Sequence, residues 1–171
     1  MTVKKHAPTI LDVEASGFGS NSYPIEIGVI HADGRKFCRL IKPFEDWRHW
    51  DNEAEMLHGI QRHDLDEFGC DPVSVCNDLN RFMEHSTAYS DGWVVDSPWL
   101  IKLFSRAGVK MTFTLSAIEY LLNQKQMDTW HSVKRWVTKQ QAQQRHRASV
   151  DAEIIQKTFV YSMYPPAQAR V

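Results

Sequence analysis

The sequence has no long apolar run, few cysteines and no excess of positive charge. No stretch approaches the roughly 20 apolar residues that a membrane-spanning helix needs, so we expect no membrane partner. The three cysteines form neither a CxxC pair nor a zinc-ligand spacing. Their odd number, with no secretory segment at the start, leads us to expect a cytoplasmic protein. The formal net charge of −1 argues against a protein that coats duplex DNA.

Internal repeats, low-complexity stretches and linkers are also absent, and the remaining composition is that of a globular protein. The 171 residues are 43% hydrophobic and 24% charged, which is enough for one substantial core. We therefore expect a single domain over residues 1–171.

The predicted secondary structure begins with strands and continues with helices. Strands are expected at 9–14, 25–31, 36–41 and 87–90, with an Asp-Gly hairpin signal between the second and third. Helices are expected at 51–57, 73–84, 99–107, 116–123, 132–143 and 148–161, with a polar loop before the second. This order indicates a mixed α/β domain.

Two carboxylates lie in the first predicted strand, where a core is expected. Because side chains alternate along a strand, Asp12 and Glu14 share one face with Ile10. Both faces of this strand carry apolar residues, which is typical of an interior strand. Two adjacent carboxylates at its end repel each other unless a cation lies between them. The alternative is that the strand emerges into solvent at Asp12.

A third carboxylate lies on the apolar face of a predicted helix. At helical spacing, Asp96 shares a stripe with Leu100 and Leu103. The alternative role for Asp96 is that of a helix N-cap. Ser97, followed by Pro98 in the first helical turn, is the better cap candidate.

The last predicted helix repeats this pattern. Asp151 falls within the buried arc formed by Ala152 and Ile155, and His146 precedes it by five residues. The alternative for Asp151 is a favourable contact with the helix dipole. Asp96 and Asp151 thus each lie on the core-facing side of the first turn of a predicted helix. This placement is explained if both first turns converge on the end of the strand that carries Asp12 and Glu14.

Five segments, in order along the chain, resemble motifs of the DEDDh 3′→5′ exonucleases, a DnaQ-like family of the RNase H-like superfamily. They are DVEASGF, YPIEIGVI, LHGI, SDGWVVD and HRASVD, and the resemblance spans residues 8–160. One departure is Asp91, where the second motif commonly has Asn or Gln. The resemblance implies an RNase H-like mixed sheet, a three-stranded antiparallel meander plus parallel strands, flanked by helices.

The same resemblance implies metal-dependent hydrolysis of phosphodiester bonds. It implies two Mg²⁺ or Mn²⁺ ions per active site, and carboxylate oxygens suit such hard cations. The implied metal ligands are Asp12, Glu14, Asp96 and Asp151. His146 is implied to be the general base, a role that its ordinary pKa suits.

The implied substrate is single-stranded DNA, RNA or a short oligonucleotide with a free 3′ end, and the products are nucleoside 5′-monophosphates. The residues predicted to contact it are Ala15, Ser16, Gly17, Phe18, His58, Arg145 and Arg147. The two arginines belong to a run, 134–147, with five cations and no acid, which otherwise reads as a solvated helix face.

Three questions stay open at the level of sequence. The preference for DNA or RNA depends on details of the nucleotide pocket, and self-association as a homodimer is implied by the resemblance alone. The alternative function is a non-catalytic nucleic-acid-binding or adaptor module on the same fold. The intact acids and His146 argue against that alternative.

Overall fold

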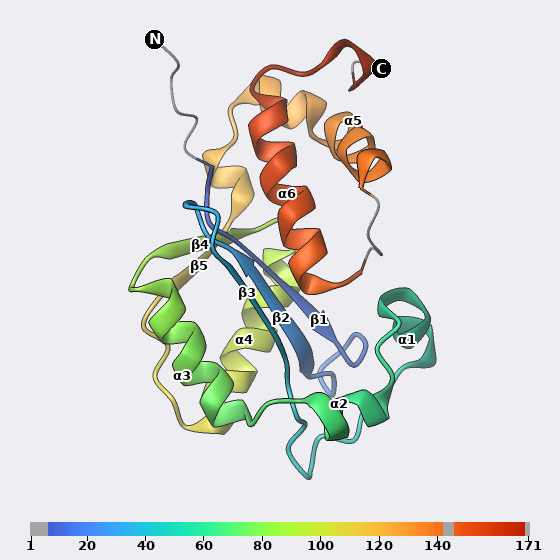
Figure 1. The fold of residues 1–171 in the computed structure, drawn as a ribbon, viewed down its shortest axis with the longest axis vertical. Coiled ribbons are helices and arrows are strands. Elements are labelled where there is room, and N and C mark those ends of the chain that lie inside the picture. The colour runs from blue at the N-terminus through green and yellow to red at the C-terminus, as the bar shows by residue number, and fades with distance from the viewer. Residues whose placement is uncertain (1–6, 142–145, 170–171) are drawn as a thin grey trace.

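A mixed five-stranded sheet forms the centre of the molecule (Figure 1). The computed structural model describes residues 7–141 and 146–169. Along the chain the strands are β1 (Ile10–Ala15), β2 (Pro24–Ile30), β3 (Lys36–Leu40), β4 (Thr87–Ser90) and β5 (Thr114–Ala117), and their order in the sheet is β3-β2-β1-β4-β5. The first three form an antiparallel meander, whereas β4 and β5 add in parallel to β1. This arrangement confirms the predicted RNase H-like fold class.

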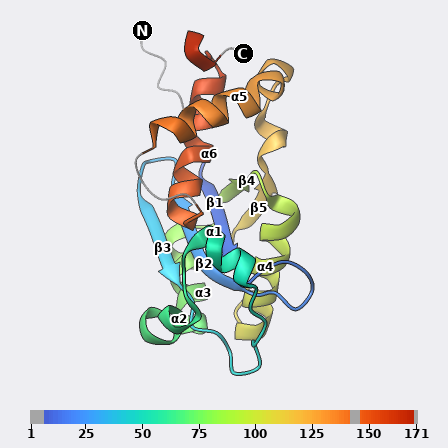
Figure 2. The ribbon, with the colours of Figure 1, turned by 90° about the vertical axis from the view of Figure 1, so that its right-hand side faces the viewer.

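Helices cover both faces of the sheet (Figures 1 and 2). They are α1 (Asn52–His58), α2 (Arg62–Phe68), α3 (Pro72–Met83), α4 (Trp93–Ala107), α5 (Gln124–Gln140) and α6 (Ala148–Ser162), with short 3₁₀ turns at η1 (Ile118–Leu121) and η2 (Ala167–Ala169). Helices α3 and α4 lie on one face of the sheet, and α6 packs on β1 and β2 from the other, with α5 against it.

Alternation along β1 divides its side chains between two cores. Leu11 and Val13 enter the larger core, which α3 and α4 complete. Ile10 points to the opposite face and joins the core beneath α6, with Ile155 and Phe159. Asp12 and Glu14 therefore lie on the α6 face, as the strand period predicted.

The start of α6 lies directly on the main chain of β2. Gly28 pairs across the sheet with Asp12, and a Cβ atom at Gly28 would lie 2.2 Å from the carbonyl carbon of Ala148 and from the nitrogen of Ser149. Only a residue without a side chain permits this close approach. Gly28 thus fixes how near the first turn of α6 comes to β1.

One predicted element and two predicted helix starts are wrong. Residues 116–123 do not form the predicted α-helix: Thr114–Ala117 completes the sheet as β5 beside β4, and only the 3₁₀ turn η1 follows it. Helix α4 begins at Trp93, four residues before the predicted cap Ser97, and exposed Pro98 lies inside it. Helix α5 begins early, after an Asn123–Gln126 capping box.

Two further differences concern short or terminal segments. The expected polar loop contains α2, which a capping box between Gln61 and Asp64 starts. Helix α5 ends at Gln140, short of the predicted end. Across the described ranges, no helix has the length and apolar character that crossing a bilayer would require.

We expect Gly28→Ala to destabilise the protein by at least about 2 kcal/mol, because overpacking against main chain cannot be relieved by a rotamer change. Chemical denaturation measures this difference. Gly34→Ala is the control: its Cβ meets nothing within 4 Å, and it carries only the strain of a left-handed backbone at φ 91°, about 1 kcal/mol. Equal losses in the two variants would contradict the close-packing role of Gly28.

Candidate active site

A cavity of about 250 Å³ opens where β1 ends. Asp12 and Glu14 line it from β1, Asp96 lines it from α4, and His146 lines it from the segment before α6. Figure 1 shows the end of β1 near α1 and near the first turn of α6. The structure therefore brings residues from three distant segments to one place, as the sequence predicted.

Asp96 reaches this cavity from the buried side of α4. Its side chain is only 2% exposed, and its Oδ2 accepts a hydrogen bond from the hydroxyl of Ser90 at the end of β4. The Ser90 oxygen in turn accepts from the Gly92 amide at 2.9 Å. Gly92, rather than Asp96, is the N-cap of α4, so the Asp96 carboxylate faces the cavity instead of capping the helix.

His146 and Asp151 are held together at the start of α6. The main-chain N–H of His146 donates to Asp151 Oδ2 at 2.9 Å, and its Nδ1 lies 3.9 Å from the same oxygen. His146 has a left-handed backbone, with φ 59°, which turns the chain sharply into the helix. Such strain in a residue other than glycine persists only where the surroundings impose it.

The carboxylates in the cavity destabilise one another's charged forms. Burial raises the pKa of Asp12 well above its ordinary value, and repulsion by Asp96 and Glu14 adds to the increase. Burial and repulsion by Asp151 raise the pKa of Glu14 to about 8. Burial also raises the pKa of Asp96 to about 7, against the opposing hydrogen bond from Ser90. In the absence of a cation, this cluster therefore retains protons near neutral pH.

The donor set fits a divalent cation. Ligand atoms of Glu14, His146 and Asp151 lie within 4.8 Å of one another, while Asp12 and Asp96 face the same cavity. Hard cations such as Mg²⁺ and Mn²⁺ prefer carboxylate oxygens. A bound cation would also remove the repulsion that raises the pKa values, so the chemistry of the site and its electrostatics agree.

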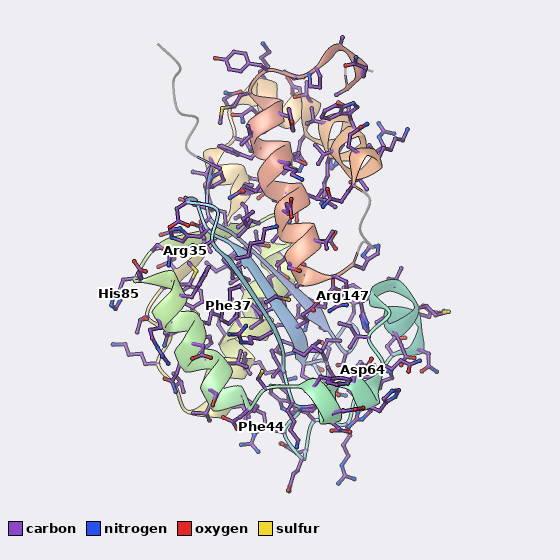
Figure 3. All side chains as sticks on the ribbon, viewed as in Figure 1. Arg35, Phe37, Phe44, Asp64, His85 and Arg147 are labelled. Carbon is purple, nitrogen blue, oxygen red and sulfur yellow. The ribbon has the colours of Figure 1, made fainter. Side chains whose placement is uncertain are left out.

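An ion pair between half-buried Arg147 and buried Glu26 anchors the segment that carries His146. Glu26 of β2 is fully buried and accepts hydrogen bonds from Arg147 Nη2 at 2.6 Å and from the Ala148 amide at 2.9 Å. Figure 3 shows Arg147 beside the sheet at the start of α6. Glu26 pairs across the sheet with Glu14. The anchor therefore sets the first turn of α6 directly opposite the carboxylates of β1.

The loop after β1 forms one wall of the cavity. Ala15 at the end of β1 and the loop residues Gly17 and Phe18 line the space. Phe18 is 68% exposed, and its ring centroid lies 6.1 Å from that of Trp99. The Ser16 hydroxyl hydrogen-bonds to His49 Nδ1 at 3.0 Å and is buried. Ser16 thus shapes the loop, while Phe18 presents an aromatic ring to the cavity.

His58, at the end of α1, lines the opposite wall. Its Nδ1 accepts a hydrogen bond from the Ile60 amide at 3.0 Å, so the neutral ring carries its proton on Nε2. Nε2 is buried without a well-formed hydrogen bond in the described part of the chain, although the main chain of Ala15 lies close enough to raise the pKa of the ring against the effect of burial. An unpaired buried donor is costly, and here it lies at a cavity that a ligand can enter.

Among the described residues, Ser16 and Arg147 were predicted to contact the substrate but do not line the cavity. Arg147 donates from Nε and Nη2 to Glu26, which leaves only part of its guanidinium for other partners. Arg145 lies outside the described residues. Asp91, which departs from the family motif, is paired with Lys134 of α5, but its negative charge still contributes to the raised pKa of Asp96.

Sequence reasoning missed Glu26 and the pairing of Lys134. The signal for Glu26 was present in YPIEIGVI, where one acid interrupts an apolar run that the structure buries completely. The same signal, an acid among apolar residues, identified Asp12, Asp96 and Asp151. Lys134 gave no comparable signal, because a lysine on an amphipathic helix is ordinarily solvated.

Comparison with known proteins supports the RNase H-like fold through structure and not through sequence. No family model and no curated protein matches the chain. Among solved structures, it is similar to exonuclease I of E. coli. Against a complex with a dA16 oligonucleotide, the TM-score is 0.69 at 11% identity, covering 92% of this chain and 42% of that chain.

Other structures of exonuclease I give the same result. A complex with a dT13 oligonucleotide has a TM-score of 0.66 at 13% identity, covering 95% of this chain and 42% of that one. A zinc-bound complex with single-stranded DNA has a TM-score of 0.65 at 14% identity, covering 92% and 41%. At such identities the similarity establishes the fold. The chain spans about two fifths of the length of these exonuclease I chains.

We expect the metal-free protein to lose stability as the pH rises from about 5 to about 8. The pKa of Glu14 is raised from 4.5 to about 8 and that of Asp96 from 3.8 to about 7. The folded state therefore holds protons that the unfolded chain has released, and this contribution disappears as the pH rises through the folded values. Burial lowers the pKa of His58, so this one group makes the protein more stable as the pH rises and opposes the effect of the carboxylates.

Thermal unfolding in EDTA across this pH range measures the effect. The control is Glu14→Gln, which removes one titrating group and should flatten the dependence. A melting temperature that rises with pH in the unsubstituted protein would contradict the raised pKa values.

Proposed function

We propose that this chain is a metal-dependent 3′→5′ exonuclease of the DEDDh type. The observation that carries the proposal is the convergence of Asp12, Glu14, Asp96 and His146 on one cavity, with Asp151 against His146. The fold shared with exonuclease I adds support, since those structures hold single-stranded DNA oligonucleotides. In this proposal residues 1–171 act as one exonuclease domain and release nucleoside 5′-monophosphates.

Four carboxylates would hold the metal, namely Asp12, Glu14, Asp96 and Asp151. We propose two Mg²⁺ or Mn²⁺ ions per site, a number that suits four acidic ligands. When bound, such ions stabilise the charge that develops on the attacking and leaving oxygens of the phosphate. Ser90 contributes indirectly, because its hydrogen bond keeps the buried Asp96 carboxylate directed at the cavity.

His146 is proposed to accept a proton from the attacking water. Its ring lines the cavity and its side chain is 39% exposed, so it can exchange protons with solvent. Asp151 fixes its main chain, and Glu26 fixes the neighbouring Arg147. The imidazole is therefore held beside the carboxylates mainly by contacts of the main chain and of the next residue, and its ring adds only the 3.9 Å approach of Nδ1 to Asp151.

The walls of the cavity would bind the terminal nucleotide. We propose that main-chain groups of 15–17 face the nucleotide, that the exposed ring of Phe18 stacks on or beside its base, and that the unpaired Nε2 of His58 donates to it. Arg147, with Nε and Nη2 taken by Glu26, would offer Nη1 to a phosphate. Arg145 remains a proposed phosphate contact on sequence grounds.

We expect Asp12→Asn and Asp151→Asn to abolish hydrolysis while leaving the protein folded. Each substitution removes a metal ligand and also relieves carboxylate repulsion, so the melting temperature without metal should not fall. The measurement is release of monophosphates from a 3′-labelled single strand with Mg²⁺, compared with EDTA. Normal turnover in either variant would refute its assignment, and retention of the strand without any release by the unsubstituted protein would favour the binding-module alternative.

We expect His146→Ala to slow the chemical step by roughly 10²–10⁴-fold, the usual contribution of a general base. Single-turnover rates at saturating enzyme and Mg²⁺ separate this loss in the chemical step from a loss of binding. His63→Ala is the matched control, since His63 is an exposed histidine of α2 outside the cavity. An unchanged rate in His146→Ala would move the base elsewhere.

A further inference from the structure

The outer face of α5 carries a cluster of basic side chains that the proposed chemistry does not use. His131, Arg135 and Lys139 recur every fourth residue and are exposed, and Lys134 lies beside them. Residues four apart on a helix are neighbours on its surface. Together with Thr138 they line a hollow of about 650 Å³. No carboxylate is among the described residues that line this hollow.

Two adjoining hollows extend this surface, which we call the α5 groove. One, of about 490 Å³, shares His131 and Lys134 with the first and reaches two carboxylates, Asp91 and Glu119. The other, of about 340 Å³, shares Arg135 and Lys139. Asp91 is followed by Gly92, which lines the active-site cavity. The α5 groove therefore begins beside the active site and continues along α5, which Figure 2 shows packed across α6.

The charges in the α5 groove are only partly balanced. Lys134 is paired with Asp91, whereas Arg135 and Lys139 have no acidic partner within 7–141 and 146–169. The chain as a whole has a net charge of −1, so a general cationic excess does not explain the cluster. Aromatic surface accompanies it, because half-buried Trp136 lines the far hollow. Unpaired cations beside an aromatic ring suit a single nucleic-acid strand.

We propose that the α5 groove binds the phosphodiester backbone of a single strand, on the 5′ side of the nucleotide held in the active-site cavity. This inference rests on the proposed function and extends it, since it assigns a path to the part of the strand that is not being cleaved. Arg135 and Lys139 would contact successive phosphates, and Lys134, by pairing with Asp91, would reduce the repulsion that a strand meets between the α5 groove and the cavity. The uncleaved part of the strand is then bound by the α5 groove alone and not by a general positive charge, which is compatible with the small net charge of the chain.

The test compares strands of different length on a catalytically inactive background. In full-length Asp12→Asn protein with Mg²⁺, the probes are a fluorescent dinucleotide and a 12-mer, both of single-stranded oligo-dT. Adding Arg135→Ala and Lys139→Ala should weaken 12-mer binding on the order of 10-fold and lower its salt slope by about 1.4. Dinucleotide affinity should stay the same, because two nucleotides do not reach the α5 groove.

Lys125→Ala is the matched control, because Lys125 is an exposed lysine on the first turn of the same helix and lies outside the α5 groove. It should leave 12-mer affinity unchanged. Equal losses for the dinucleotide and the 12-mer, or an unchanged 12-mer affinity in the double variant, would overturn the proposal. Should the double variant unfold, Arg135→Glu alone gives the same comparison.

Failure of the α5 groove proposal can be distinguished from failure of the proposed exonuclease function. If the unsubstituted protein releases no monophosphate from any strand, the exonuclease proposal fails, yet the length-dependent binding still tests the α5 groove. If hydrolysis proceeds and affinity does not depend on strand length beyond two nucleotides, the α5 groove proposal fails alone.

Discussion

Repulsion among carboxylates at the end of β1 is the constraint on which the rest of the site depends. Asp12 and Glu14 share the face of β1 that α6 covers, and Asp96 arrives buried from α4. A fold that places these groups together gives up stability unless protons or cations compensate them. The raised pKa values of all three record that cost in the metal-free state. Metal-dependent hydrolysis, the proposed function, is the chemistry that best suits this cluster of carboxylates.

The surrounding scaffold holds the groups together against this repulsion. Gly28 allows the first turn of α6 to contact the main chain of β2, and buried Glu26 ties that turn down through Arg147 and the Ala148 amide. His146, whose backbone adopts a left-handed conformation, lies between this anchor and the cavity. Packing, an ion pair and local strain therefore combine to place one imidazole and one carboxylate opposite β1.

Much of this arrangement could be predicted from the sequence, because it follows from periodicity. The strand period placed Asp12 and Glu14 on one face, which the structure confirms. The helical period placed Asp96 and Asp151 toward the core; Asp96 is buried there, whereas Asp151 is half-buried. β5 could not be predicted in this way, because its four residues fit either a strand or a helix and only the free edge of β4 decides between them. The roles of Glu26 and Lys134 depend on partners more than 40 residues away, which local patterns do not report.

Cation binding coupled to proton release tests the central claim most directly. Titration of the metal-free protein with Mn²⁺ near neutral pH, in buffers of different ionisation enthalpy, gives both the number of ions bound and the number of protons released. We expect two ions and a net release of protons, because the carboxylates with raised pKa values must ionise to bind. Absence of Mn²⁺ binding at millimolar concentration, or binding without proton release, would contradict a cluster of carboxylates that is completed by metal.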